Sequence, residues 1–151
     1  MSFDSSRDNE TAIVALTRKG VELGRRLRPL LPGSHLYLPG KFAAEGKPDE
    51  HFFLPPSKEV AGEIFRRYRY LVLIMAVGIA VRLIAPELRN KHKDPGIVVL
   101  DDAGIFSISL LSGHIGGANE LSKKIASFVG AHPVVTTASE VGKTIAVDLL
   151  G

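Results

Sequence analysis

The sequence predicts a three-layer α/β domain with a mostly parallel sheet and one hairpin. Short apolar, β-branched runs alternate with segments whose apolar residues have helical spacing, which is typical of α/β folds. Residues 70–76 (YLVLIMA) are continuously apolar, as expected for a parallel strand buried on both faces. The 151 residues suffice for one sizeable core. We expect a single domain over residues 12–151, preceded by a disordered segment over residues 1–11.

The first part of the chain predicts two strands and a helix between them. The apolar runs at residues 12–17 and 35–38 have the length and composition of strands. Between them, apolar residues at helical spacing are interspersed with charged ones, and Pro29 and Pro32 should end the helix.

The middle of the chain predicts an irregular connection followed by a second β–α repeat. Residues 40–56 are rich in glycine, proline and charge, which is typical of a surface connection. Ser57 is a suitable N-cap for a helix that runs to Arg67. After the strand at 70–76, Gly78 is expected to permit a turn into the next helix.

The last part of the chain predicts a hairpin, a helix and a final strand. The helix before it should kink or restart near Pro86. Residues 101–104 (DDAG) are a hairpin signal whose second strand covers residues 105–111. Apolar residues at helical spacing predict a helix over 121–129, and residues 132–138 predict a strand. This order of elements predicts a Rossmann-like arrangement.

Composition excludes several kinds of site. The chain has no cysteine, so disulfides, thiol nucleophiles and thiolate metal sites are excluded. Its five histidines show no metal-ligand spacing, and we expect no metal site. The start of the chain lacks the apolar core of a secretory signal, and Arg82 interrupts the longest apolar run, residues 70–86. We therefore expect a cytoplasmic protein with no membrane attachment.

The formal net charge of +3 is concentrated in two basic segments, residues 18–28 and 89–93. Such segments are most often solvated helix faces. A polyanionic ligand is the second interpretation and nucleic acid the third. A protein that binds single-stranded nucleic acid would need aromatic residues interleaved with the basic ones, and these segments have none. We therefore expect no nucleic-acid partner.

The stretch LLSGHIGGANEL, residues 110–121, concentrates glycines and polar side chains between a strand and a helix. It could be a ligand cradle, a catalytic turn or only a tight connection. The pattern is not a P-loop, since Ala118 follows Gly117 where lysine is required, and it is not G-x-G-x-x-G. Glu140 lies beyond the next strand, where a ribose-binding acid could sit, so a dinucleotide interpretation stays open weakly.

The loops after the 70–76 and 105–111 strands are expected to share one ligand site, because ligands bind at the carboxyl ends of strands in open α/β sheets. Glycines and helix N-termini at both loops favour an anionic group. Arg82 either binds that group through two hydrogen bonds or is only a charged side chain on the surface. We expect Gly78, Arg82, His114 and Asn119 to border a single cleft.

Side chains of the second loop can carry acid–base chemistry. His114 is the side chain of this loop that titrates near neutrality. Glu120 is either a second acid–base group or a complement to the helix dipole, the latter being favoured. Asn119 could hold a carbonyl or an oxyanion; alternatively, Asn119 or Ser112 only caps the helix.

Three stretches, AVGIAVR, K..DP and LLSGH.GGANEL, together with PVVTTASEV, closely resemble the amino-terminal domain of the cobalt-precorrin-5A hydrolase family of anaerobic cobalamin biosynthesis. The resemblance is strongest over residues 70–141 and extends more loosely back to Ala12. It implies a hydrolase that opens the δ-lactone of cobalt-precorrin-5A and releases acetaldehyde, which leaves cobalt-precorrin-5B. The substrate is a tetrapyrrole with many carboxylates.

The resemblance also implies partners and roles. Cobalt would arrive within the substrate, so no cofactor is expected, and family members continue into a carboxyl-terminal domain that this chain lacks. That domain or a companion chain is the expected partner; a homo-oligomer is left open. As a hypothesis, His114 activates water with Glu120 as the second catalytic residue. The expected substrate-binding residues are Gly78, Arg82, Ser112, Gly113, Gly116, Gly117 and Asn119. The alternative is a non-catalytic module that binds a tetrapyrrole or a nucleotide.

Overall fold

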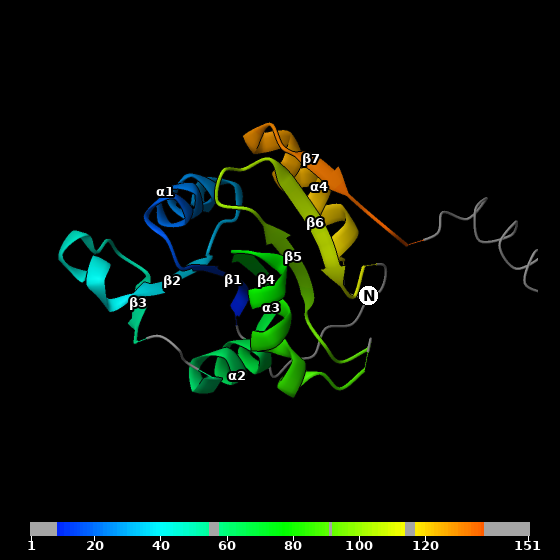
Figure 1. Cartoon of the computed structure of the whole chain (residues 1–151), viewed down its shortest axis with the longest axis horizontal. Helices are drawn as coiled ribbons and strands as arrows, with labels where there is room; N and C mark the ends of the chain where they lie inside the picture. The colour runs from blue at the N-terminus through cyan, green and yellow to red at the C-terminus, as the bar shows by residue number, and fades with distance from the viewer. Residues whose placement is uncertain (1–8, 55–57, 91, 114–116, 138–151) are drawn as a thin grey trace, which may run out of the picture.

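The computed structural model describes residues 9–54, 58–90, 92–113 and 117–137, in which strands and helices alternate (Figure 1). The strands are β1 (Asn9–Ala15), β2 (His35–Pro39), β3 (Glu50–Phe53), β4 (Tyr68–Ile74), β5 (Gly96–Leu100), β6 (Phe106–Leu111) and β7 (His132–Val134). The helices are α1 (Arg18–Leu27), α2 (Lys58–Arg67), α3 (Val77–Ile84) and α4 (Ala118–Val129), with 3-10 turns η1 (Arg28–Leu30), η2 (Gly40–Glu45) and η3 (Ala85–Glu87). Among these residues, no helix is both long and apolar enough to cross a membrane.

The strands of the described chain form one sheet in the order β3-β2-β1-β4-β5-β6-β7. The first five run parallel, whereas β6 is antiparallel to β5 and β7 is parallel to β6. Helices α1 and α4 cover one face, and α2 and α3 cover the other (Figure 1). The predicted three-layer α/β fold with a mostly parallel sheet and one hairpin is confirmed.

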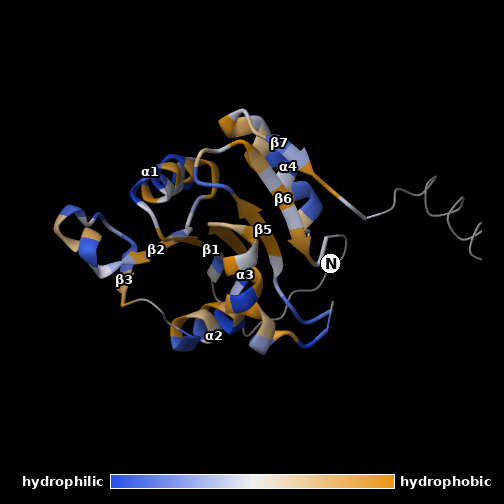
Figure 2. Cartoon of the chain, in the orientation of Figure 1, coloured by the Kyte–Doolittle hydropathy of each residue, from blue (hydrophilic) through white to orange (hydrophobic). Residues whose placement is uncertain are grey.

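The central strands supply the cores on both sides of the sheet, because successive side chains point to opposite faces. On β4, Val72 and Ile74 pack with α1 and α4, while Leu71 and Leu73 pack with α2 and α3. Every residue of β5 is buried. Each such aliphatic side chain contributes roughly 1.5–3 kcal/mol by leaving water. Figure 2 shows the apolar colours concentrated on these strands.

Several predicted boundaries differ from those in the structure. Strand β1 begins at Asn9, so part of the segment expected to be disordered pairs with β4. Strand β3 lies inside the segment expected to be irregular, and it pairs with β2 at the edge of the sheet. Its signal is weak because two of its four residues, Glu50 and His51, are polar. The final strand ends at Val134, four residues before its predicted end.

Two predicted helix ends are confirmed. Helix α1 ends at Leu27, and the chain continues as a 3-10 turn that contains Pro29. Helix α3 ends at Ile84 and restarts as the 3-10 turn that contains Pro86. Proline removes a helical hydrogen bond in each case, so the chain tightens or changes direction.

The predicted hairpin between β5 and β6 is also confirmed. The backbone N–H of Gly104 donates to the Asp101 carbonyl over 2.9 Å, and Gly104 has a φ of +72°, which glycine adopts without strain. The Asp101 carboxylate accepts from the N–H groups of Ile105 and Phe106 at 2.9 and 2.6 Å. These bonds reverse the chain. As a result, β6 and β7 run in the opposite direction to the five parallel strands.

Candidate functional site

The two glycine-containing loops lie at opposite ends of the strands, one where the parallel strands end and the other where they begin. Ile74, at the end of β4, pairs with Leu100, which pairs with Ser107 near the start of β6. Leu111, at the end of β6, instead pairs with Ile97 near the start of β5. The loops that follow β4 and β6 therefore leave the sheet in opposite directions. The expectation that they share one cleft is wrong, because the hairpin reverses β6.

The predicted residues consequently separate into two groups. Gly78 and Arg82 lie on α3, at the edge where β4 ends. The second group follows β6 at the other edge and consists of Ser112, Gly113, Gly117, Asn119 and Glu120. His114 and Gly116 lie outside the described residues. The second group, which flanks His114, is the one that carries polar side chains suited to chemistry.

Backbone hydrogen bonds close the loop between β6 and α4. The N–H of Ala118 donates to the Ser112 carbonyl at 3.3 Å, and the N–H of Asn119 donates to the Gly113 carbonyl at 3.0 Å. Ser112 has a φ of +57°, which is uncommon for serine, and its hydroxyl donates to the Asp94 carbonyl at 3.3 Å. These contacts fix both ends of the loop and occupy two N–H groups at the start of α4.

Two glycines of this loop are required by packing. Gly117 has a φ of +86°, and a Cβ there would lie 2.9 Å from the Tyr70 hydroxyl. A Cβ on Gly113 would lie 2.5 Å from Oδ1 of Asn119. The interpretation of a tight connection therefore accounts for these two glycines without a ligand.

Asn119 is buried and holds three segments together. Its Oδ1 accepts from the Ser109 hydroxyl on β6 at 2.7 Å, and its Nδ2 donates to Oγ1 of Thr137, after β7, at 2.8 Å. Both polar atoms of the side chain are thus engaged within the protein. This arrangement favours a positioning role for Asn119 over direct contact with a substrate.

A cleft of about 360 Å³ opens beside Gly117. It lies at the edge of the sheet where β1 and β4 begin, and α4 forms one wall. Its polar and charged lining comprises Glu10, Thr11, Arg69, Tyr70, Glu120 and Lys124. This volume is at the lower end of the range for small-molecule sites, so it suits a substituent of a large ligand better than a whole macrocycle.

The cleft carries both signs of charge. The Arg69 guanidinium lies 5.1 Å from the centre of the Tyr70 ring, a cation–π distance. Glu120 is 84% exposed and lies 3.6 Å from Nζ of Lys123, an ion pair one turn along α4. Arg69 and Lys124 can bind a carboxylate, while Glu120 is accessible for proton transfer. A carboxylate at Glu120 also complements the helix dipole, as the favoured interpretation holds.

At the opposite edge, Gly78 is part of a helix and does not form the expected turn. Helix α3 begins at Val77, and a Cβ on Gly78 would meet no heavy atom of the described chain within 4 Å. Neither backbone conformation nor packing within these residues requires glycine there. Arg82 is exposed one turn further along α3. This edge includes the carboxyl ends of β1 and β4, the topological switch point of the sheet.

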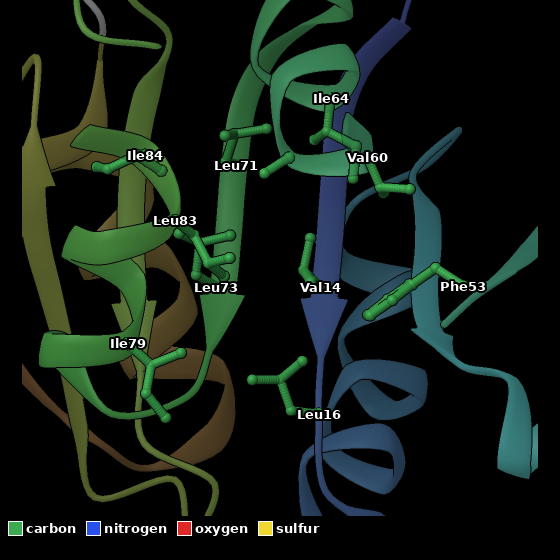
Figure 3. Close-up of a pocket in the computed structure, with 11 residues that line it drawn as sticks. Val14, Leu16, Phe53, Val60, Ile64, Leu71, Leu73, Ile79, Leu83 and Ile84 are labelled. Carbon is green, nitrogen blue, oxygen red and sulfur yellow. The ribbon is translucent and has the colours of Figure 1, made fainter. Parts of the chain in front are cut away.

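An apolar groove leads from this edge across the face of the sheet (Figure 3). It has a volume of about 180 Å³ and lies between α2, α3 and the strands beneath them. Leu16 and Ile79 line it near the strand ends, and Ile64 and Leu71 line it at the other end. All eleven of its lining residues are apolar, so the groove can accept apolar surface but offers no group for acid–base chemistry.

No group of three or more histidine, cysteine, aspartate or glutamate side chains suited to a metal ion occurs in the part of the chain that the structure describes. The fold does bring two histidines together from neighbouring strands. Nδ1 of His35 lies 3.1 Å from Nε2 of His51. Sequence spacing could not reveal this pair, because the partner strand β3 was not predicted.

The cleft residues Glu10, Arg69, Tyr70 and Lys124 were also not predicted. They come from the beginnings of β1 and β4 and from the second turn of α4. The hairpin at 101–104 was the sequence signal that could have located this cleft. Because the hairpin reverses β6, the loop after β6 must lie at the end of the sheet where β4 begins.

The comparisons with known proteins agree on a family. A family model described as "Cobalamin synthesis G N-terminal" matches residues 59–140, more than half of the chain. A cobalt-precorrin-5A hydrolase from Priestia megaterium is 44% identical over 93% of this chain and 38% of its own length. A cobalt-precorrin-5A hydrolase from Salmonella typhimurium is 42% identical over 98% of this chain and 41% of its own length. The chain thus spans about two-fifths of the length of these relatives.

A solved structure supports the fold. The crystal structure of a cobalamin biosynthesis protein G homolog from Sulfolobus solfataricus superimposes with a TM-score of 0.64. It is 23% identical, and the match covers 91% of this chain and 39% of that one. At this identity the likeness establishes the architecture alone. The family match over residues 59–140 carries the identification: the chain belongs to the cobalamin synthesis G N-terminal family.

Proposed function

We propose that this chain is the amino-terminal part of a cobalt-precorrin-5A hydrolase, which opens the substrate δ-lactone and releases acetaldehyde. The observation that carries the proposal is the 44% and 42% identity, over nearly the whole chain, to two relatives with that name. Because the chain spans only 38–41% of their length, the complete activity belongs in this proposal to a protein that also contains the remaining portion. That portion, on the same or a companion chain, is the proposed partner.

The proposed substrate site is the cleft beside α4. Arg69 and Lys124 supply positive charge for an acetate or propionate side chain of the macrocycle, and arginine can bind a carboxylate through two hydrogen bonds. The cobalt ion travels inside the substrate and needs no ligand set from this cleft. Gly78 and Arg82, at the other edge of the sheet, are not part of this site.

His114 is the proposed general base. Neutral imidazole removes a proton from water, and the water oxygen attacks the lactone carbonyl. The acyl–oxygen bond then breaks, and the imidazolium returns the proton to the alkoxide oxygen that leaves. Negative charge develops on the carbonyl oxygen during the attack and needs N–H donors. Since the N–H groups of Ala118 and Asn119 are already bonded within the loop, the backbone at Gly116 and Gly117 is the proposed donor.

Glu120 and Asn119 have different proposed roles. The exposed carboxylate of Glu120 lines the cleft and can accept the hydroxyl proton as that C–O group becomes the C=O of acetaldehyde. The C–C bond to the macrocycle breaks in this step, and its electron pair stays on the macrocycle, which takes up a proton. Asn119 acts on the loop, through its bonds to Ser109 and Thr137, and is a positioning residue.

A non-catalytic module that binds the tetrapyrrole is the second candidate. The limited share of the relatives' length that this chain covers favours it, because the acid–base groups could all lie in the remaining portion. A nucleotide ligand has weaker support, since the loop lacks both nucleotide-binding patterns.

The experiment is an acetaldehyde-release assay with the cobalt-precorrin-5A lactone, using this chain joined to or mixed with the remaining portion of a relative. We expect His114→Ala to lower kcat by about 10²-fold or more, the usual contribution of a general base. His132→Ala, which alters an exposed histidine on β7, is the matched control and should leave kcat unchanged. A His114→Ala rate within about threefold of the wild type would remove the base role. Tight substrate binding without any acetaldehyde would favour the binding module.

A further inference from the structure

A cluster of four aromatic side chains lies apart from the cleft, where β2, β3 and β4 run side by side. His35 and Tyr37 come from β2, His51 from β3 and Tyr68 from the first position of β4. The register places His51 directly beside Tyr37, and their rings stack with centres 4.7 Å apart. The rings of His35 and His51 also stack, at 5.0 Å. The fold therefore holds both imidazoles in defined positions.

Two polar atoms of this cluster lie against one nitrogen, Nδ1 of His35. Nδ1 of His35 lies 3.1 Å from Nε2 of His51 and 3.1 Å from the Tyr68 hydroxyl. A neutral imidazole nitrogen has a single lone pair or a single hydrogen, so Nδ1 cannot satisfy both neighbours fully. The Tyr68 hydroxyl has a second partner, the Tyr37 hydroxyl, at 2.8 Å. Tyr68 can therefore release His35 without being left unpaired.

We propose that His35 and His51 together bind a divalent first-row transition-metal ion through Nδ1 and Nε2. Metal–imidazole bonds of about 2.05 Å and the 3.1 Å separation give an angle of roughly 100° at the metal, between the octahedral and tetrahedral values. Imidazole is a preferred ligand of zinc, nickel and copper, whereas magnesium and calcium prefer oxygen. Water completes the coordination, since His51 is exposed and His35 is half-buried.

The surroundings set limits on this site. Partial burial and the neighbouring His35 lower the pKa of His51, which disfavours the protonated imidazole there. Burial raises the pKa of Tyr68, which keeps that phenol protonated and acting as a hydrogen-bond donor, not as a third ligand. Arg67 and Arg28 also disfavour positive charge at His51, while Asp49 favours it. Two protein ligands in this setting predict a reversible site that is weaker than a closed structural zinc site.

The test uses the untagged chain and measures Zn²⁺ binding by calorimetry and Ni²⁺ or Cu²⁺ binding by tyrosine fluorescence. The chain has no tryptophan and three tyrosines, two of which are in this cluster, so a paramagnetic ion at the site should quench the emission. We expect saturable binding of one ion, tightest for Cu²⁺ in accordance with the Irving–Williams order. Affinity should fall at acid pH, because protons compete with the metal ion for imidazole nitrogens.

Variants distinguish the proposed chelate from adventitious binding. His35→Ala and His51→Gln should each weaken binding at least about tenfold, the lower bound for even the outer-shell partners of metal sites. Glutamine at position 51 keeps hydrogen-bonding capacity, so this variant remains informative if the alanine variant fails to fold. Tyr68→Phe should retain the affinity, and His132→Ala is the matched control. Equal affinity in the wild type and in both histidine variants, or no saturable binding by the wild type, would overturn the proposal.

Discussion

Two strand-to-helix connections, each with glycine in or next to the first turn of its helix, differ in why the glycine is there. At Gly117, before α4, the backbone has a positive φ, and a Cβ would collide with Tyr70. At Gly78, in α3, the backbone is helical, and a Cβ would meet no described atom within 4 Å. The first glycine is explained by the fold of the described chain, whereas the second is not. Glycine in a strand-to-helix connection is therefore not by itself a sign of a ligand site.

The largest test of this comparison is Gly117→Ala. We expect it to lower the free energy of unfolding by about 2–5 kcal/mol, which combines roughly 1–2 kcal/mol for left-handed backbone with about 1–3 kcal/mol for overpacking. Urea denaturation followed by circular dichroism measures the change. Adding Tyr70→Ala should recover part of the loss, since it removes the side chain that the new methyl group meets. A Gly117→Ala variant as stable as the wild type would contradict the packing explanation.

Asn119→Ala tests how far the hydrogen bonds of Asn119 stabilise the loop before α4. The substitution removes the partner of Ser109 and of Thr137, and we expect a loss of about 1–3 kcal/mol in unfolding free energy. Ser127→Ala, on the exposed face of the same helix, is the control and should stay within about 0.5 kcal/mol. Loss of substrate affinity in Asn119→Ala without loss of stability would indicate direct contact with the ligand instead.

Gly78→Ala should have the smallest effect on the free energy of unfolding, and it should stabilise the protein where the other two substitutions destabilise it. Alanine in a helix with free space should raise the free energy of unfolding by roughly 0.5–1 kcal/mol. Gly24→Ala on α1 provides the matched comparison, because there a Cβ would lie 2.9 Å from Cδ1 of Leu36. Thermal unfolding of the two variants should show the gain only at position 78. A destabilised Gly78→Ala would show that the space beside α3 is filled in the folded protein.

The sequence predicted the layers and the type of most elements, because these depend on local spacing. The continuous apolar run of β4 was sufficient to predict a buried parallel strand, and the Asp101–Gly104 turn was sufficient to predict a hairpin. The error in the site came from applying the carboxyl-edge rule to β6 after that hairpin had reversed it. The polarity of a strand decides which edge its loop reaches, and this information was already present in the sequence.

Other features depended on contacts between distant segments. Strand β3 has a polar sequence, and its Glu50 is held by Arg25 of α1 at 2.8 Å. Burial opposes ionisation of Glu50, yet the hydrogen bonds from Arg25 and from the Lys47 N–H keep the pKa of its carboxyl below the usual value. Without β3 in the prediction, neither the His35–His51 pair nor the cluster around it could be anticipated.

The two outermost strands of the sheet limit how this protein can associate with other polypeptides. Strand β3 has four residues, and strand β7 has three, with Pro133 in the middle. Short strands and a proline that lacks an N–H group offer a poor template for adding another strand. In the described part of the chain, both outermost strands are therefore poorly suited to edge-to-edge growth into larger aggregates. Stable association with further protein should instead use the helical faces or the ends of the strands.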